Sequence, residues 1–211
     1  ENGCAVVTSS FIYLDENGVT IKASENAVIG ESYELGGVSY LVVDSTMLYD
    51  MVNKEEDVTK VVTTNVKNMY GMFFGAASFN QDIGNWDVSS VTNMDNLFNQ
   101  AFDFNQDISS WDVSNVTNMS GMFANTDFNQ DISSWDVRNV TNMSVMFANT
   151  EFNQDISFWD VSKVTDMNSV FARATSFNQD IGRWDVSNVT SMSAVSYTHL
   201  RAHETSLHLV C

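Results

Sequence analysis

Two sets of aspartates recur at fixed positions along this sequence, and their carboxylates could serve more than one kind of chemistry. One set stands in the tripeptide Asn-Gln-Asp and comprises Asp82, Asp107, Asp131, Asp155 and Asp180. The other directly follows tryptophan and comprises Asp87, Asp112, Asp136, Asp160 and Asp185. Aspartate in a tight turn accepts hydrogen bonds from nearby backbone N–H groups, which gives it a structural role. Carboxylate oxygens are also the ligands that Ca²⁺ prefers. The second set is therefore a candidate calcium site, and both interpretations stay open.

The rest of the composition does not favour catalysis. All three histidines lie near the end of the chain, at His199, His203 and His208. Ser-His-Asp catalysis, Cys-His catalysis and His-ligated zinc are thereby excluded from the preceding residues. Glycoside hydrolysis needs one acid and one base in distinct environments, and equal repeated carboxylates lack that asymmetry. We predict that the chain is not an enzyme and has no cofactor, with calcium as the alternative and a glycan-active enzyme as the least favoured one.

These aspartates belong to a repeat that fills most of the chain. The string Phe-Asn-Gln-Asp-Ile begins at Phe79, Phe104, Phe128, Phe152 and Phe177, at intervals of 24 or 25 residues. Trp-Asp-Val follows at a constant offset and accounts for all five tryptophans of the protein. A period in the twenties is typical of one turn of a leucine-rich-repeat-type solenoid. The spacing predicts an α/β solenoid, a leucine-rich-repeat-like right-handed coil of short parallel strands and short helices.

The apolar spacing within one copy predicts the elements of each turn. Trp111 and Val113 alternate with a polar residue, so a short strand would point both toward the core. Ser114 would then cap a short helix beginning at residue 115 or 116, with Met119 and Phe123 on its buried face. A methionine recurs at the same helical position in successive copies, which indicates core packing rather than a metal site. These methionines are Met69, Met94, Met119, Met143, Met167 and Met192.

The residue before each tryptophan is the one strand position that varies freely. This position reads Asn85, Ser110, Ser134, Phe158 and Arg183 along the chain. Solenoids build binding surfaces from changeable outward side chains on a rigid scaffold, so we predict that these five residues contact a partner. Phe158 and Arg183 are the expected anchors, because aromatic and Arg side chains dominate interface energetics. Neutral drift of a surface position would produce the same variation.

Residues 1–57 precede the repeats and are predicted to form a β-hairpin and helix module that caps the solenoid. The pairs Asn17-Gly18 and Gly36-Gly37 each lie between β-prone runs and predict hairpin turns. Asp44 or Ser45 is placed to cap a short helix that continues to about residue 53.

The repeats themselves occupy residues 58–194, as about five copies of 24–25 residues. Residues 195–211 break the pattern abruptly in composition. They resemble translated adapter sequence, and we expect a non-native tail there.

The charge of the chain limits its partners. The net charge is −18, from 27 acidic and 9 basic residues. Nucleic acids and anionic membrane surfaces are disfavoured, because phosphate binding requires Lys and Arg. No apolar run is long enough to cross a membrane.

The repeated string resembles the bacterial surface protein repeat of about 26 residues found in BspA-like proteins and mycoplasma-type lipoproteins. The match covers Val58–Ala194 and rests on Phe-Asn-Gln-Asp-Ile-Ser-x-Trp-Asp-Val with the later Met-Phe pair. The resemblance implies export, an extracellular position on the bacterial cell surface, and adhesion to a protein or glycan, for example on a host. It implies no catalytic residues. The predicted function is a non-catalytic surface or secreted adhesion protein, with a calcium-stabilised surface scaffold as the alternative.

Overall fold

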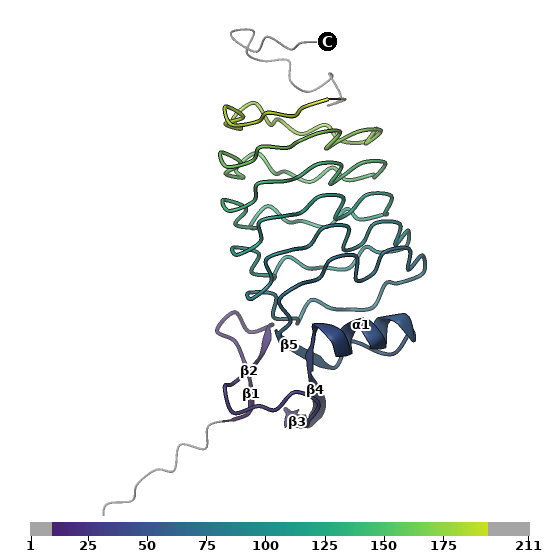
Figure 1. Cartoon of the computed structure of the whole chain (residues 1–211), viewed down its shortest axis with the longest axis vertical. Coiled ribbons are helices and arrows are strands. Elements are labelled where there is room, and N and C mark those ends of the chain that lie inside the picture. Colours follow the sequence, from purple (N-terminus) through teal and green to yellow (C-terminus); the bar gives the residue numbers. More distant parts are fainter. Residues whose placement is uncertain (1–9, 194–211) are drawn as a thin grey trace, which may run out of the picture.

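The computed structural model describes residues 10–193, and within them the regular helix and strands all precede the first tryptophan, Trp86. The last strand, Val61–Asn65, falls inside the predicted repeat range of 58–194. Figure 1 shows these elements at one end of the molecule and the repeats stacked beyond them as successive turns of the chain. The elements are β1 (Ile12–Leu14), β2 (Ile21–Ala23), β3 (Ser32–Leu35), β4 (Val38–Asp44), α1 (Ser45–Asn53) and β5 (Val61–Asn65).

Both predicted hairpins are present, but their turns differ. Strands β3 and β4 pair antiparallel with Leu35 opposite Val38, so Gly36-Gly37 form a two-residue loop. Both glycines have positive φ, at 61° and 81°, as such a loop requires. Strands β1 and β2 pair antiparallel with Leu14 opposite Ile21, which leaves a longer connection around Asn17-Gly18.

The tight turn expected at Asn17-Gly18 is therefore wrong in length. Gly18 has a positive φ of 73°, whereas Asn17 is not among the positive-φ residues. The Asn17 side chain instead accepts hydrogen bonds at Oδ1 from the backbone N–H groups of Val19 and Thr20, each at 2.9 Å. Two backbone hydrogen bonds help to close this longer loop, from the Gly18 N–H to Asp15 O and from the Asp15 N–H to Thr20 O. The Asn17 side chain and these bonds together replace a two-residue turn.

The helix α1 confirms the predicted capped segment. Asp44 is its N-cap and accepts a hydrogen bond from the Met47 N–H at 2.9 Å. Leu48 is fully buried on the inner face. The helix connects β4 to β5, which pair in parallel with Leu41 opposite Val61.

Beyond β5, the chain winds in turns whose starting residues pair with one another. Isolated parallel bridges join Asn68 to Asn93, Asn93 to Asn118, Asn118 to Asn142, and so on to Ser191. We call the stretches between successive bridges coils 1 to 5. These are residues 68–92, 93–117, 118–141, 142–165 and 166–190, and each holds one tryptophan. The leucine-rich-repeat-like solenoid class stays a prediction for this stack.

The segment predicted as a short helix is a run of tight turns. The backbone N–H groups of Met119, Gly121, Phe123 and Asn125 donate to carbonyl oxygens of the next coil, at 2.8–3.0 Å. The intervening Met122 N–H donates to the carbonyl only three residues back, at 3.2 Å. An α-helix needs bonds four residues back throughout, and the positive φ of Gly121 and Asn125 interrupts it. The helix expectation is therefore wrong, because repeated turns also bring every third or fourth side chain to one face.

The strand predicted at Trp111–Val113 is also wrong. Local turns bound it on both sides, since the Trp111 N–H donates to Ile108 O and the Val116 N–H donates to Val113 O. Too few residues remain between these turns for a ladder, and the parallel bridge lies at Asn118 instead. The alternation of burial holds, with Trp111 and Val113 buried and Asp112 exposed.

The core consists of rows of equivalent side chains from successive coils. The Phe98 ring stacks on Phe104 of its own coil at 3.7 Å and on Phe123 of the next at 5.9 Å between centroids. Core packing of the methionines is confirmed for a set of buried members, while Met192 is partly buried. The buried members are Met69, Met94, Met119, Met143 and Met167.

The Asn-Gln part of the repeat forms a ladder between coils. The Asn129 side chain accepts at Oδ1 from the Asn153 N–H at 2.9 Å and from Gln154 Nε2 at 3.0 Å. Gln154 Nε2 also donates to the Asn129 carbonyl. The same pattern links Asn105 to residues of the following coil. These amides therefore help to hold successive coils together.

Candidate binding surface

The five residues before the tryptophans occupy equivalent places in successive coils, and we call them the pre-tryptophan row. The first three bond back to the preceding turn of the chain. Asn85 Nδ2 donates to Thr59 O at 3.4 Å, Ser110 Oγ to Gly84 O at 2.6 Å and Ser134 Oγ to Ser109 O at 3.3 Å. These side chains were expected to point freely outward, but they help to hold the stack together. Ser and Asn reach a carbonyl one coil away because their polar atoms lie close to the backbone.

Phe158 and Arg183 differ from the other members of the row. Phe158 has no side-chain donor and is 76% exposed. The guanidinium carbon of Arg183 lies 5.5 Å from the centre of the Phe158 ring, within the range of a cation–π contact. The two residues therefore form one pre-assembled aromatic and cationic feature on the surface.

A small hollow surrounds this pair, with a volume of about 210 Å³. Carboxylate, amide and hydroxyl groups complete its lining. The lining residues are Asp155, Ser157, Phe158, Gln179, Asp180 and Arg183. The site thus combines an exposed ring with charged hydrogen-bonding groups of both signs, which suits contact with a protein or a glycan.

Both aspartate sets make the same local contact. In each set Oδ1 accepts a hydrogen bond from the backbone N–H two residues later, as for Asp131 with Ser133 and Asp160 with Ser162. The backbone N–H of Ser133 is the main cause that lowers the pKa of Asp131 below its ordinary value. The pKa of Asp160 is lowered chiefly by its hydrogen bond with the Ser162 side chain. These carboxylates therefore act as turn-forming acceptors, the structural role considered for them.

The lowered pKa values predict a loss of stability in acid. When the folded-state pKa is depressed, the stabilisation is complete above the unfolded-state pKa, about 3.9 for Asp. It is lost as the pH falls through the folded-state pKa. We expect a nearly constant melting temperature from about pH 7 to pH 5 and a fall below about pH 4. Protonation of the carboxylates also reduces the repulsion between negative charges in this acidic chain, which by itself would raise the melting temperature. An Asp131→Asn variant should therefore show a shallower fall than wild type, and an identical pH profile would contradict this assignment.

Asp87 departs from the rest of its set. Its side chain is only 2% exposed, whereas Asp112 at the equivalent position is exposed. Thr64 Oγ1 donates to Asp87 Oδ2 at 2.7 Å, and Ser89 Oγ donates to Oδ1 at 2.6 Å. The Thr64 hydroxyl in turn accepts from the Ala23 N–H of β2. Asp87 is buried where Asp112 is exposed, because the N-terminal hairpin covers coil 1 at this point.

Within residues 10–193, no group of three or more His, Cys, Asp or Glu side chains is arranged to hold a metal ion. The five calcium candidates stand one in each coil. Cys4, the three histidines, Cys211 and the predicted tail at 195–211 lie outside the described residues. In the described part of the chain, no helix is both long and apolar enough to span a membrane.

The segment that contains the repeats matches a known protein family. The family model described as "Mycoplasma protein of unknown function, DUF285" matches residues 44–151 and 124–206, which together exceed half of the chain. The chain belongs to this family. The matched segments begin at Asp44 and include coils 1 to 5 with the pre-tryptophan row. No curated protein and no solved structure matches this DUF285 chain.

Proposed function

We propose that this DUF285 chain is a non-catalytic adhesion protein of the bacterial cell surface or the secreted fraction. The pre-tryptophan row would contact another protein or a glycan, with Phe158 and Arg183 as anchors. The observation that carries the proposal is the 76% exposure of the Phe158 ring, held in place by Arg183. A large aromatic side chain kept in water is costly unless a partner covers it.

The proposal extends to fold class and location. We assign the stacked coils to leucine-rich-repeat-like solenoids of the BspA-like type, on the basis of the repeat length and the repeated string. Solenoids of this kind present extended surfaces built from equivalent positions. The inter-coil ladders supply the rigidity that such a surface needs, since an ordered surface loses less entropy when it binds.

The proposal predicts that removing the two anchors weakens binding without unfolding the chain. Wild-type protein and the Phe158→Ala/Arg183→Ala variant are compared for saturable binding to cultured epithelial cells and to a printed array of glycans and extracellular matrix proteins. We expect the double variant to lose about 2 kcal/mol or more, about thirtyfold in dissociation constant. The expectation follows from the loss of both hot-spot side chains.

Phe102→Ala is the matched control. Phe102 is also an exposed phenylalanine, at 51%, but it lies in a turn outside the pre-tryptophan row. Its removal should leave binding unchanged, and all variants should retain the wild-type circular dichroism spectrum. Equal binding by the double variant, or equal losses for Phe102→Ala, would refute the assigned surface.

A further inference from the structure

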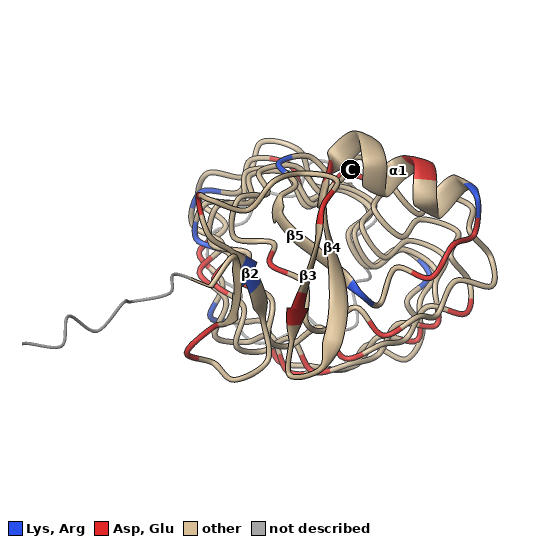
Figure 2. Ribbon diagram, turned by 90° about the horizontal axis from the view of Figure 1, so that it is seen from below, with Lys and Arg blue, Asp and Glu red and all other residues tan. Residues whose placement is uncertain are grey.

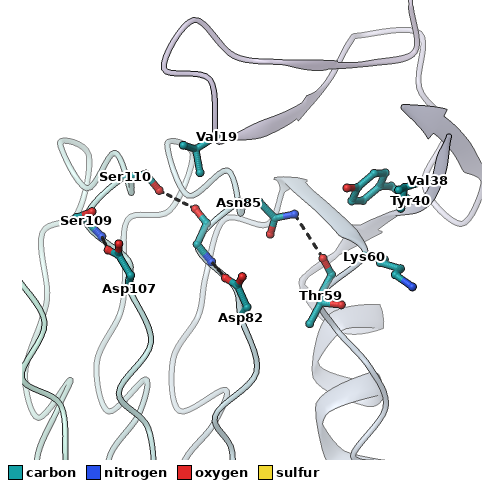
Figure 3. A pocket seen from close by; sticks show the side chains of 11 residues that line it. Val19, Val38, Tyr40, Thr59, Lys60, Asp82, Asn85, Asp107, Ser109 and Ser110 are labelled. Atoms are coloured by element: carbon teal, nitrogen blue, oxygen red, sulfur yellow. Dashed lines mark hydrogen bonds between the residues drawn. The ribbon is translucent and has the colours of Figure 1, made fainter. Parts of the chain in front are cut away.

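A second and larger hollow lies at the junction between the N-terminal elements and the first coils. Its volume is about 550 Å³. Figure 3 shows Val19 descending from the β1–β2 connection on one side and Val38 and Tyr40 of β4 on the other, with coil side chains below. The rest of the lining includes Lys60, Asp82, Asn85, Asp107, Ser109 and Ser110. This hollow is the other end of the pre-tryptophan row, away from Phe158 and Arg183.

Two carboxylates of this hollow are held in fixed positions but are not neutralised. Asp82 Oδ1 accepts from the Gly84 N–H at 3.1 Å, and Asp107 Oδ1 accepts from the Ser109 N–H at 3.0 Å. Within residues 10–193, the second oxygen of each carboxylate accepts no hydrogen bond and neither carboxylate forms an ion pair. Figure 3 shows Lys60 directed away from both. The hollow therefore presents a pair of oriented negative charges from adjacent coils.

Two polar side chains of the hollow already donate to the protein itself, while Lys60 and the hydroxyls of Tyr40 and Ser109 are further donors of the lining. The Ser110 hydroxyl already donates to Gly84 O, and the Asn85 amide donates to Thr59 O. Asn85 Oδ1 is buried and accepts no hydrogen bond, which leaves an unsatisfied acceptor at the base. A native structure seldom leaves such an acceptor without a partner. The two carboxylates and this acceptor favour a ligand that brings donors and positive charge.

We propose that this junction hollow binds the arginine side chain of a basic peptide segment. The guanidinium offers five donors in a planar fork that matches carboxylates, as Asp82 and Asp107 require. Val19 and Val38 supply apolar walls for the methylene stem, and the Tyr40 ring offers a face to the cation. The net charge of −18 attracts basic segments from a distance. Seen from the end that carries the N-terminal elements, Asp and Glu outnumber Lys and Arg around the outline (Figure 2).

The proposal goes beyond the adhesion surface, because its charged contacts come from Asp82 and Asp107, which are not in the pre-tryptophan row, and because it specifies a charged occupant. Asn85 and Ser110 of that row also line the hollow. A neutral glycan is the competing occupant. A neutral glycan would not depend on the negative charge of the two carboxylates. Its binding should therefore persist when both are replaced by amides of the same shape.

The test uses the full chain and a fluorescent peptide, acetyl-Gly-Arg-Gly-Arg-Gly-amide, at about physiological ionic strength, where charges beyond about 8 Å are screened. A citrulline peptide of the same length provides the matched ligand, since it keeps the shape and removes the charge. We expect the Asp82→Asn/Asp107→Asn variant to bind the arginine peptide at least about tenfold more weakly than wild type. The amide variant retains Oδ1 for the turn, so folding is preserved. Wild type should also prefer arginine over citrulline by about tenfold or more.

Asp112→Asn/Asp131→Asn is the control variant, since it changes the net charge equally but lies outside the hollow. It should bind within about twofold of wild type. Phe158→Ala/Arg183→Ala should also bind the peptide normally, which separates this site from the adhesion surface. The proposal is overturned if wild type shows no saturable peptide binding, or if the citrulline peptide binds equally well. Equal losses in the two aspartate variants would also overturn it, as would glycan binding at this site without peptide binding.

Discussion

Replacing Trp135 by alanine is expected to lower the free energy of unfolding by about 3–5 kcal/mol. Trp135 is 4% exposed, and its ring centre lies 6.2 Å from that of Phe123. Its Nε1 donates to Ile108 O of the preceding coil at 3.2 Å. The substitution therefore removes a large buried side chain and one of the two donors to Ile108 O, which keeps its hydrogen bond from the Trp111 N–H. Equilibrium urea unfolding followed by circular dichroism measures the loss.

Two further variants separate the causes of this loss. Trp135→Phe keeps an aromatic ring but removes the donor, and it should cost about 0.5–1.5 kcal/mol for the lost hydrogen bond, because Ile108 O still accepts from the Trp111 N–H. Trp184→Ala acts at a half-buried member of the same row and should cost less than Trp135→Ala. In a stack where coils contact only their neighbours, the central loss should also uncouple the coils on either side and broaden the transition. A loss below about 1 kcal/mol for Trp135→Ala would show that the tryptophans do not hold the coils together.

Replacing Asp87 by alanine should cost about 2–3 kcal/mol of unfolding free energy, although the residue occupies a repeated position. Its buried carboxylate accepts from the side chains of Thr64 and Ser89, and Thr64 in turn accepts the Ala23 N–H of β2. Hydrogen bonds to charged groups are stronger than those between neutral groups. Removing the carboxylate also leaves the Thr64 and Ser89 hydroxyls without their acceptor. The loss should appear in urea unfolding, with faster hydrogen exchange along β2.

Asp112→Ala is the matched control, because Asp112 holds the equivalent place in the next coil but is exposed. Among residues 10–193, its Oδ1 accepts only from the Ser114 N–H, at 3.1 Å. We expect a loss below about 1 kcal/mol, typical of a single exposed turn contact. Equal losses for the two variants would mean that the turn contact, and not the junction with β2, accounts for the cost at Asp87.

Local chemistry is strong in the N-terminal elements, and the sequence predicted these well. Gly36-Gly37 marked a two-residue turn, because few other pairs tolerate positive φ at both positions. Asp44 marked the start of α1 through its short acceptor side chain. The length of the connection at Asn17-Gly18 was harder to predict. The Asn17 side chain stabilises a loop longer than two residues, and the spacing of residues in the sequence does not reveal this.

The candidate sites divide in the same way. Phe158 and Arg183 could be found from sequence alone, because comparison of the repeat copies reveals that the position before tryptophan varies while its neighbours recur. The junction hollow could not, since its walls come from Val19 and Tyr40 on one side and Asp107 on the other. Residues so far apart in sequence are brought together only by tertiary packing, and no periodicity signals their meeting.

The period of the chain alone determined that equivalent side chains would stack, because the same apolar residues return every 24 or 25 positions. It also determined which side chains are buried, as the rows of Trp, Phe and Met show. Tertiary structure decided the backbone between them. Every second backbone N–H of the Met119–Asn125 segment could donate to a carbonyl of its own coil, as in a helix, or to a carbonyl of the next coil. In the structure these groups donate to the next coil. A neighbouring coil at hydrogen-bonding distance supplies carbonyl acceptors for these N–H groups and so prevents a helix. A single repeat does not contain that neighbour, so its sequence alone cannot predict this outcome.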